Sequence, residues 1–493
     1  MGVFDFLRKK KPAKSRRAGR GLSRRYLRAP TIPGTEGGWN PIGGMERAFG
    51  DLPKVRARAR DNAMNTPYGV RAVRTLTDHS VGSGIRYRVA GDPEYRAALN
   101  AWAGSSDCDH RGTQTLYDLQ ATAAETLFSG GDVLWVFRHV ENPETGRLEL
   151  TIQIIDPEQI DTWAPARHPG NEVQQGVEVD PDGRVVGYHV RASMDSTLPG
   201  NWETEFIPAS RCILMLERRY PDQIRGIPRG AAALERLHQG DSLFVSELAR
   251  ARTQAAFGVF LRVPESEDGA KGLLGEIDPN EDSDDAVPEV LVPGSVTVLP
   301  PGYEPTMATP SQSGGFTDHI RKTIEAVAVG YGVLYYHISG DVTGFNYSSG
   351  KLGETDFRRS IDSLRAHTIY PVLLRIEREF RDVYEINEMR DVDVAVRMVP
   401  PARESMEPAK EIAAELSELA AGLLPLEEAW LRRGYDPDDM WAALKEQGQK
   451  LAELSASGMP LKFGSLDLTA TLIAAQNAED DSGASLPGNP EPD

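Results

Sequence analysis

The feature that most limits the fold of this sequence is a change of pattern between two helical segments in the middle of the chain. Residues 229–262 carry apolar side chains at helical spacing, and residues 312–333 do so again. The intervening segment, 263–311, contains the acidic loop Glu276–Glu289 and two short runs, 290–294 and 295–300, that predict strands. The chain therefore needs a fold in which two paired helices carry a small β-rich insertion, like a stalk with a cap.

The segments before these helices alternate between helical and strand patterns. Apolar residues recur at three- and four-residue steps over 51–82 and 115–129, which predicts helices. Asp180-Pro-Asp-Gly183 lies between two strand-like runs and is typical of a hairpin turn. We therefore predict an α+β domain over 82–217, with strands at 133–140, 148–154, 176–179, 185–190 and 211–216.

The chain after residue 351 is mainly helical in pattern. Helical spacing over 352–382 includes Pro371, so we expect a kink or break there, because proline cannot donate the backbone hydrogen bond. A short strand pattern at 392–399 is followed by further helical segments within 408–456.

Length and charge distribution indicate how many domains the chain has and where its charge is concentrated. Its 493 residues exceed one ordinary hydrophobic core, which favours two to four domains. The net charge of −18 is uneven: residues 1–28 hold eleven Lys or Arg and one acidic residue, a net of +10, so the rest carries −28. This asymmetry predicts a basic arm on an acidic body, and the body as a whole should repel DNA.

Several kinds of site are excluded or disfavoured by the residues present. The chain has two cysteines, too few for a disulfide framework, and Cys108-Asp-His110 lacks the second ligand pair of a zinc site. No apolar run reaches the length of a membrane span, and the basic N-terminal residues are not followed by the apolar segment of a secretory signal. No motif assembles a nucleophile, a base and an orienting group, so we predict no catalytic residues, no metal and no cofactor.

The polar, glycine-punctuated stretch Tyr335–Lys351 interrupts the helical pattern on both sides, which predicts a loop. Its end, Gly344-Phe-Asn-Tyr-Ser-Ser-Gly350-Lys351, is similar to a phosphate-binding loop. Five residues instead of four separate the glycines, and Leu352 stands where a magnesium-binding Ser or Thr is needed. The spacing therefore argues against a nucleotide site.

The acidic loop has the oxygen-ligand spacing of an EF-hand at five positions: Asp278, Asn280, Asp282, Asp284 and Glu289. The turn glycine is replaced by a serine, and amphipathic helices are missing on both sides. A solvated acidic loop fits these departures better than a Ca²⁺ site does.

Several motifs, taken in order, resemble the lambda-type portal proteins of tailed phages, the head–tail connector subunits. The resemblance covers about residues 45–460. Its most specific part is Pro-Asp-Gln-x-Arg-Gly-x-Pro before a long helix, followed later by Gly-Asp-x-x-x-x-Asn-Tyr-Ser-Ser. The motifs that carry it are Arg60-Asp-Asn-Ala-Met, His79-Ser-Val-Gly-Ser83, Ile154-Ile-Asp-Pro-Glu-Gln159, Arg218-Arg-Tyr-Pro-Asp-Gln-Ile-Arg-Gly-Ile-Pro228, Leu291-Val-Pro-Gly294, Ser339-Gly-Asp341 and Asn346-Tyr-Ser-Ser349.

The resemblance implies an α+β subunit with an α/β wing, a two-helix stem, a small β-rich clip and a helical crown, assembled as a ring. The corresponding parts of this chain are a basic disordered arm (1–45), the wing (46–228), stem helices (229–262 and 312–333), the clip (263–311), a tunnel loop (334–350), a long kinked helix with a wing return (351–400), the crown region (401–475) and a disordered tail (476–493).

The resemblance also implies which residues meet partners. The tunnel loop would face the DNA channel through Ser339, Gly340, Asp341, Thr343, Gly344, Asn346, Tyr347, Ser348 and Ser349. The clip would dock partner proteins near Glu276, Asp278, Asp282 and Asp284. The candidate partner-binding residues of the arm are Arg8, Lys9, Lys10, Lys11, Arg16, Arg17, Arg24 and Arg25.

The implied role is structural and not enzymatic. A ring of typically twelve copies would sit at one capsid vertex of the virion, after assembly in the host cytoplasm, and double-stranded DNA would enter and leave through it. The implied partners are further copies of the chain, the terminase large subunit, the major capsid or scaffold protein and a head-completion protein, with no membrane. Two other interpretations stay open: an enzyme that acts on nucleotides or nucleic acid through Gly344–Lys351, and a ring adaptor without a DNA channel.

Overall fold

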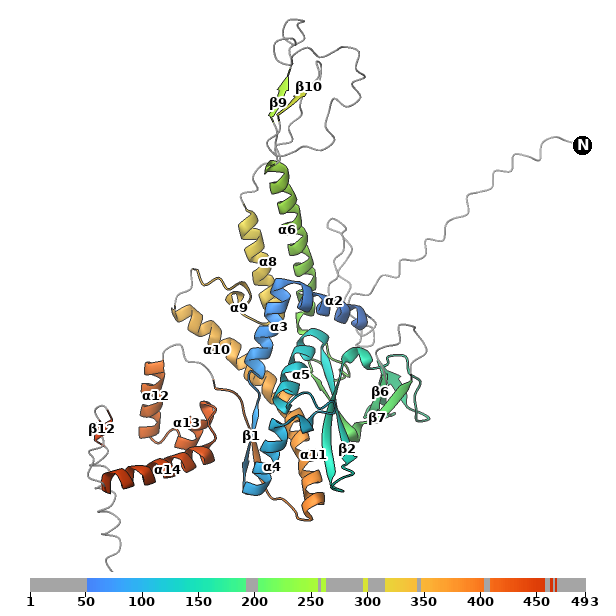
Figure 1. The fold of residues 1–493 in the computed structure, drawn as a ribbon. Helices are drawn as coiled ribbons and strands as arrows, with labels where there is room; N and C mark the ends of the chain where they lie inside the picture. The colour runs from blue at the N-terminus through green and yellow to red at the C-terminus, as the bar shows by residue number, and fades with distance from the viewer. Residues whose placement is uncertain are drawn as a thin grey trace, which may run out of the picture. The chain divides into compact units, whose positions relative to one another are not determined.

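A computed structural model describes most of the chain between residues 51 and 467. The described ranges are 51–191, 203–255, 259–262, 296–299, 315–343, 347–402, 408–456, 462–463 and 466–467. These residues belong to two compact units (Figure 1). The first unit is drawn from Met1–Gly82 and Ala101–Asp391, and the second from Ser83–Asn100 and Val392–Asp493.

The first unit is built from helices and mainly antiparallel strands, as the α+β prediction requires. Its helices are α2 (Leu52–Asn65), α3 (Pro67–Ser80), α5 (Leu116–Gly130), α6 (Leu234–Ala255), α8 (Phe316–Tyr331), α9 (Tyr335–Ser339), α10 (Tyr347–Leu364) and α11 (Tyr370–Glu388). Its strands are β2 (Asp132–Glu141), β3 (Leu148–Ile155), β4 (Glu172–Gln174), β5 (Val177–Val179), β6 (Val185–Arg191), β7 (Thr204–Pro208), β8 (Cys212–Leu216), β9 (Val259–Arg262) and β10 (Val296–Leu299).

The predicted helix over 51–82 is two helices with a sharp boundary. Thr66 has an extended backbone and caps α3 by accepting a hydrogen bond from the Gly69 N–H, and Pro67 fills the first helical position. The predicted helix over 115–129 is confirmed as α5. It begins with a reciprocal capping box, in which the side chains of Thr115 and Asp118 each accept from the other's backbone N–H.

The strand β2 is the centre of the first unit. It pairs antiparallel with β3 on one side and with β8 on the other, in the order β3-β2-β8. Its residues Val133–Phe137 are almost completely buried, including the alternate positions that would face solvent in a half-exposed strand. The unbroken apolar run at the start of β2 therefore reflects a strand covered on both faces.

A second antiparallel sheet, β4-β5-β6-β7, covers one of these faces. Leu134 and Val136 of β2 share a buried apolar cluster with residues of the second sheet, namely Val177, Val179, Tyr188, Val190 and Ile207. The predicted hairpin is confirmed: across the turn between β5 and β6, the Asp180 N–H donates to the Arg184 carbonyl, and the Asp180 carbonyl accepts from the Gly183 N–H.

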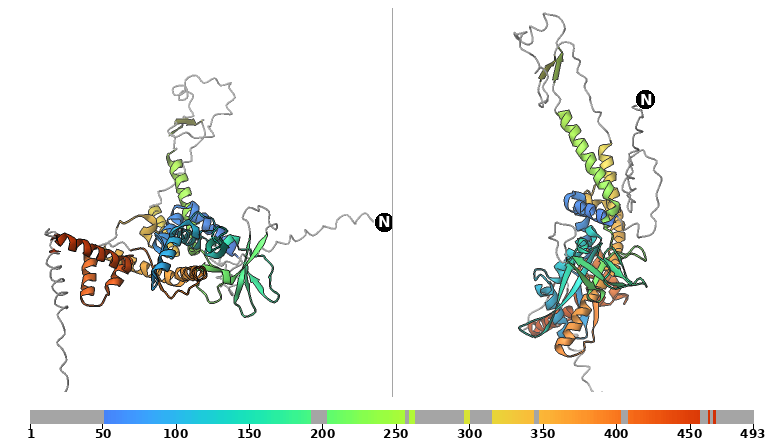
Figure 2. Two further views of the ribbon diagram at one scale, coloured as in Figure 1. Left: turned by 60° about the horizontal axis from the view of Figure 1, so that its bottom comes forward. Right: turned by 90° about the vertical axis from the view of Figure 1, so that its right-hand side faces the viewer.

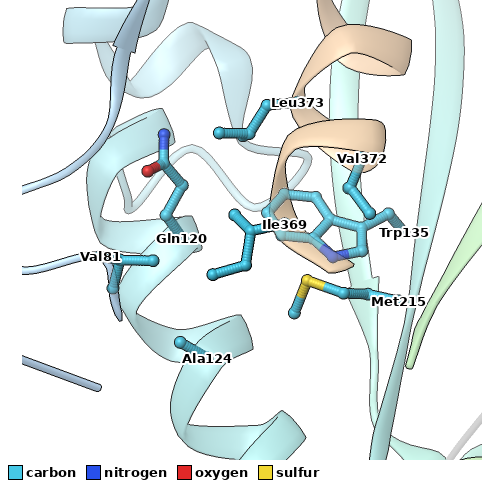
Figure 3. A pocket seen from close by; sticks show the side chains of 8 residues that line it. All are labelled: Val81, Gln120, Ala124, Trp135, Met215, Ile369, Val372 and Leu373. Atoms are coloured by element: carbon cyan, nitrogen blue, oxygen red, sulfur yellow. The ribbon is translucent and has the colours of Figure 1, made fainter. Parts of the chain in front are cut away.

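Helices cover the opposite face of the three-stranded sheet. Figure 3 shows a small apolar cavity there, with Trp135 and Met215 from the sheet, Val372 from α11 and Ala124 from α5, and with Ile369 between the sheet and α5. Ile369 ends a π-helical turn, Arg365–Ile369, that joins α10 to α11. The irregularity predicted at Pro371 thus takes the form of a π-turn immediately before it, which accommodates a residue without a backbone N–H.

A buried carboxylate ties the first unit together. Asp132, at the start of β2, is completely buried and accepts hydrogen bonds from the guanidinium groups of both Arg56 on α2 and Arg225. The Arg225 contact is bidentate, with Nε–Oδ2 and Nη2–Oδ1 distances of 2.7 and 3.1 Å, and the Gly226 N–H donates to Oδ2 at 2.7 Å. One carboxylate therefore joins a helix, a strand and the segment that leads into α6.

The charges at this cluster stay ionised at neutral pH. Burial by itself would raise the pKa of Asp132, but the charges of Arg225 and Arg56 and their hydrogen bonds bring it below its usual value. Burial, together with the charge of Arg225, lowers the pKa of Arg56 to about 10, still well above neutrality. The fully buried Arg225 also donates to the backbone carbonyls of Gln175 and Pro157, so its guanidinium makes four hydrogen bonds in all.

The helices α6 and α8 lie side by side and run antiparallel (Figures 1 and 2). Near one end of the pair, the rings of Phe244 and Phe316 meet edge to face, with centroids 5.7 Å apart. At the other end a Cβ added to Gly230 would lie 2.1 Å from the ring of Tyr331, so only glycine fits beneath that ring. At this end, Gly230 thus allows the segment that leads into α6 to approach α8 closely.

The long helix predicted over 229–262 is shorter than expected. It ends at Ala255, and Val259–Arg262 forms the strand β9, which pairs in parallel with β10. The predicted strand at 295–300 is confirmed as β10, while the strand-like run 290–294 lies outside the described residues. β-Branched and aromatic residues at 259–262 explain why the helix does not continue there.

The second unit joins two segments that are distant in sequence. Its strands are β1 (Arg86–Ala90), β11 (Ala395–Val399), β12 (Lys462–Phe463) and β13 (Leu466–Asp467), and its helices are α12 (Pro408–Ala420), α13 (Leu426–Arg432) and α14 (Pro437–Ala456). The boundary with the first unit falls within α4 (Pro93–Gly104). β1 pairs antiparallel with β11, from Arg86 opposite Val399 to Ala90 opposite Ala395.

The sequence places residues 83–100 and 392–400 in the wing, whereas the structure groups them with the C-terminal helices. Two ion pairs within this unit link β1 and α4 to those helices, Arg88 with Glu427 at 3.1 Å and Arg96 with Asp438 at 2.8 Å. The pairing of residues more than three hundred positions apart has no local signal in the sequence.

No helix among the residues described above is both long and apolar enough to cross a membrane.

The Asp132 cluster predicts a large difference between two single substitutions. Asp132→Asn should lower the free energy of unfolding by about 3–5 kcal/mol, because it leaves two buried guanidinium groups without a counter-charge. Glu205→Gln, which breaks the half-exposed pair with Arg138, should cost no more than about 1 kcal/mol. Urea denaturation of both variants measures the two values, and equal costs would contradict the assignment of Asp132 as a central support.

Candidate functional site

The candidate site is the short connection between the helices α9 and α10. The sequence predicts a loop over 334–350, but the structure folds both of its ends: α9 takes Tyr335–Ser339, and Tyr347 begins α10. The chain between them is residues 340–346, of which 340–343 are described. The reason for the shorter loop is that His337 and Ile338 are buried, so this part of the polar stretch packs against the body of the unit.

The described loop residues form a compact hydrogen-bonded turn. Gly340 has a left-handed backbone (φ +69°) and ends α9 by donating its N–H to the Tyr336 carbonyl. The Asp341 carboxylate accepts from the Thr343 N–H at 2.9 Å and from its hydroxyl at 2.5 Å. These hydrogen bonds lower the pKa of Asp341, so the turn carries a negative charge at neutral pH.

The predicted channel residues are thus only partly brought together. Ser339, Gly340, Asp341 and Thr343 meet in the turn, where the Ser339 hydroxyl accepts from the Asp341 N–H at 3.1 Å. The other predicted residues divide into Tyr347, Ser348 and Ser349, which form the first turn of α10, and Gly344 and Asn346, which lie outside the described residues. The arm residues from Arg8 to Arg25 and the clip residues from Glu276 to Asp284 also lie outside them.

Of the Gly344–Lys351 stretch, the structure describes residues 347–351, and all of them are helical. Gly350 and Lys351 belong to the helix α10, and the described element that precedes them is the short helix α9. A phosphate cradle of this type needs a loop between a strand and a helix, with free backbone N–H groups that point inward. The described residues therefore give no support to the nucleotide-binding interpretation of this stretch.

Directly behind the turn, a buried carboxylate on α10 holds two side chains of α9. The Oε1 atom of Glu354 lies 2.8 Å from Nε2 of His337, and the Tyr336 hydroxyl donates to the same oxygen. Glu354 is 7% exposed and His337 8%. The ring of His337 packs against Phe357 of α10 and His79 of α3, with centroid distances of 4.7 and 5.4 Å.

The electrostatics of this cluster favour one ionised carboxylate. The hydrogen bond from His337 lowers the pKa of Glu354 to about 2, against the effect of burial, with further contributions from Tyr336 and Arg358. Burial and the hydrogen bond to Glu354 raise the pKa of Tyr336, which therefore stays a protonated donor. Burial and the neighbouring His337 lower the pKa of His79, so His79 is neutral at pH 7.

Sequence reasoning missed this cluster, although one signal was present. Glu354 follows the spacing of the buried residues Phe357 and Ile361, three and seven positions later on α10. A carboxylate on the apolar stripe of a helix needs a buried partner, and a nearby histidine is a natural one. Nothing local in the sequence indicates that the partner is His337.

Metal binding has no support in the part of the chain that the structure describes. No group of three or more His, Cys, Asp or Glu side chains is placed there to hold a metal ion. Cys108 is buried, and burial raises its thiol pKa to about 12, so its thiol is neither ionised nor exposed.

Two glycine substitutions test the close contact at the start of α6. Gly230→Ala should destabilise the protein by about 1–3 kcal/mol, because the new methyl group would overlap the ring of Tyr331. Gly353→Ala, inside α10, meets only Leu334 at 3.5 Å and should stabilise by up to about 1 kcal/mol through helix propensity. Denaturant midpoints measure both effects, and a neutral Gly230→Ala would contradict the packing described here.

The family model and the curated relative that match this chain both describe portal proteins. The family model described as phage portal protein, lambda family, matches residues 33–365, about two-thirds of the chain. A relative named "Probable portal protein" from Halomonas phage phiHAP-1 is 24% identical over 451 residues, 84% of this chain and 83% of the relative.

One solved structure that is similar in fold is a chain from the virion of a native gene transfer agent particle. It has a TM-score of 0.42 and 14% identity, and covers 81% of this chain and 95% of the other. A portal protein of the HK97 phage family from Corynebacterium diphtheriae has a TM-score of 0.33 and 12% identity, with 71% and 95% covered. The assignment rests on the family model. The chain belongs to the lambda family of phage portal proteins.

Proposed function

We propose that this portal protein forms a ring at one vertex of a phage capsid and that double-stranded DNA passes through the centre of the ring. The observation that carries the proposal is the turn between α9 and α10, which follows closely on the stem helix α8. Its Asp341 carboxylate is ionised and its hydrogen bonds are made within the turn. Such a surface repels phosphate and offers few donors to it, as passage without lasting contact requires.

The composition of the loop and of the whole body supports this role. Residues 339–350 contain no Lys or Arg, and the chain after residue 28 carries a net charge of −28. A protein that held DNA firmly would instead need a basic stripe that neutralises phosphates. We therefore propose a conduit and not a DNA-binding enzyme.

Ring formation would cover an apolar surface on the stem. On α6, Leu243 and Phe244 are more than a third exposed, Leu248 is half exposed and Val245 is 67% exposed. A face of this kind suits a head-to-tail contact between copies, and contacts of that type close into rings. We propose that the stem of a neighbouring copy covers it.

The remaining partners follow from this role. We propose that the ring docks the terminase large subunit and later a head-completion protein through the clip, and that the capsid or scaffold protein surrounds it. Assembly would take place in the host cytoplasm before the ring becomes part of the virion.

One image of the purified protein tests the ring. Negative-stain electron microscopy should show an annular particle with a central hole, with a mass of many copies by light scattering. Monomers or dimers at every salt concentration would contradict the ring, and rings without a hole would favour an adaptor that has no DNA channel. ATP hydrolysis that Lys351→Ala abolishes would instead favour an enzyme.

A lysine in the turn should slow the packaging of DNA. Val342 is 66% exposed, and Val342→Lys would add one cation per copy where the channel loop meets phosphates. We expect packaging in vitro to slow by roughly several-fold, with partial recovery at higher salt, because each new phosphate contact is screened by salt. Val342→Gln controls for polarity, and Met64→Lys, on an exposed site of α2, controls for charge. Equal rates for Val342→Lys and both controls would remove this loop from the channel.

A further inference from the structure

The helix α9 is too short to be stable by itself. It has five residues, a little more than one turn, whereas isolated helices need more than about twelve to be marginally stable in water. Contacts with the rest of the unit must therefore fix it. Ile338 is buried, Arg71 of α3 donates from Nε to the His337 carbonyl at 3.0 Å, and the Arg321 guanidinium lies over the Tyr335 ring.

Glu354 contacts α9 in a different way, because one of its oxygens accepts from two α9 side chains. His337 Nε2 lies 2.8 Å away and the Tyr336 hydroxyl bonds to the same atom. The second carboxylate oxygen lies 3.6 Å from the Arg358 guanidinium, one turn further along α10. Glu354 thus fixes two successive residues of α9 to the first half of α10.

The buried surroundings make this contact costly to lose. Phe357 from α10 and His79 from α3 enclose the His337 ring, so water has little access to the imidazole. A buried donor that loses its acceptor without gaining water costs more than the hydrogen bond itself. Without the carboxylate, His337 would have to leave this position or stay unpaired.

The orientation of α9 determines where the turn leaves the body. The Gly340 N–H donates to the carbonyl of Tyr336, the residue that Glu354 holds, at 3.0 Å. The Tyr335 hydroxyl lies 3.4 Å from Oδ2 of Asp341. The position of residues 340–343 therefore depends on α9, and Glu354 is one of the contacts that fix α9.

We propose that Glu354 is the positioning residue of the DNA-channel turn. Through Tyr336 and His337 it fixes α9 at the N-terminal part of α10, and so keeps residues 340–343 at a set place in the channel. This proposal rests on the proposed function, since the turn is taken to face DNA. It adds a residue that does not contact DNA but fixes the position of the turn that does.

The experiment compares three substitutions within the cluster, two of Glu354 on α10 and one of Tyr336 on α9, with one control substitution on α10. Glu354→Ala removes both hydrogen bonds, Glu354→Gln keeps an acceptor for one donor, and Tyr336→Phe removes a single hydroxyl. Asp356→Asn, two residues further on the exposed face of α10, removes the same charge without touching α9. Each protein is assembled into rings, and their particle mass and thermal midpoint are recorded first.

Two measurements follow on the same rings. Hydrogen exchange of the peptide that covers 335–341 should accelerate on the order of tenfold or more in Glu354→Ala, and less in Glu354→Gln and Tyr336→Phe, while Asp356→Asn matches the native protein. The length of DNA retained per particle should fall in the same order, from Asp356→Asn, through Glu354→Gln, to Glu354→Ala. Partial rescue by glutamine separates positioning from a general loss of stability.

The outcomes are distinct. Unchanged exchange in Glu354→Ala would overturn the role of Glu354 in fixing α9. Faster exchange with normal DNA retention would overturn its role in the channel. If Glu354→Ala does not assemble, Tyr336→Phe alone decides, because the loss of one hydroxyl leaves the rest of the cluster in place. A different result would contradict the proposed function itself. In that case native rings form, but particles that lack the protein retain as much DNA as particles that contain it.

Discussion

The fold depends on one buried carboxylate, Asp132, and on the two arginines that surround it. Arg56 and Arg225 are 76 and 93 residues away from it in sequence. A buried ion pair contributes little to stability compared with apolar packing, but it is costly to break, because a charge left unpaired in the interior is strongly unfavourable. It therefore selects one arrangement of α2, β2 and the segment before α6. The sheets and helices of the first unit can pack as they do only when this arrangement is present.

This cluster also gives a structural reason for the motif that most clearly marks the family. In Pro221–Pro228, Arg225 supplies the guanidinium, Gly226 supplies an N–H, and the Gln223 side chain donates to the Arg225 carbonyl at 2.9 Å. Gly226 cannot carry a side chain, since a Cβ would lie 1.8 Å from the Gly131 carbonyl oxygen. The Asp156 carboxylate of a second motif pairs with Arg60 of a third. These three motifs thus supply contacts that hold the first unit together.

The sequence predicts those parts of the fold that have a local signal. The helix α5, the strands β2 and β3 and the hairpin at Asp180–Gly183 follow from periodicity and turn chemistry. The pairing of β1 with β11 has no such signal, because it joins residues 86–90 to 395–399 and only tertiary contacts select it. For the same reason the candidate site was predicted only in part. The loop composition pointed to 334–350, but the burial of His337 and Ile338, which turns its first third into a helix, depends on residues that precede it by more than two hundred and fifty positions.

Two buried carboxylates of the first unit, Asp132 and Glu354, differ in their partners, and this difference has a mechanical consequence. Asp132 accepts four hydrogen bonds through both of its oxygens, three from the guanidinium groups of Arg56 and Arg225 and one from the Gly226 N–H. Glu354 accepts from a hydroxyl and an imidazole through only one oxygen, so fewer hydrogen bonds hold it. The stronger contact lies among α2, β2 and the segment before α6, and the weaker one lies where the turn leaves the body. In the channel that we propose, this order of strengths would give a rigid frame and a local contact that yields first as DNA moves past.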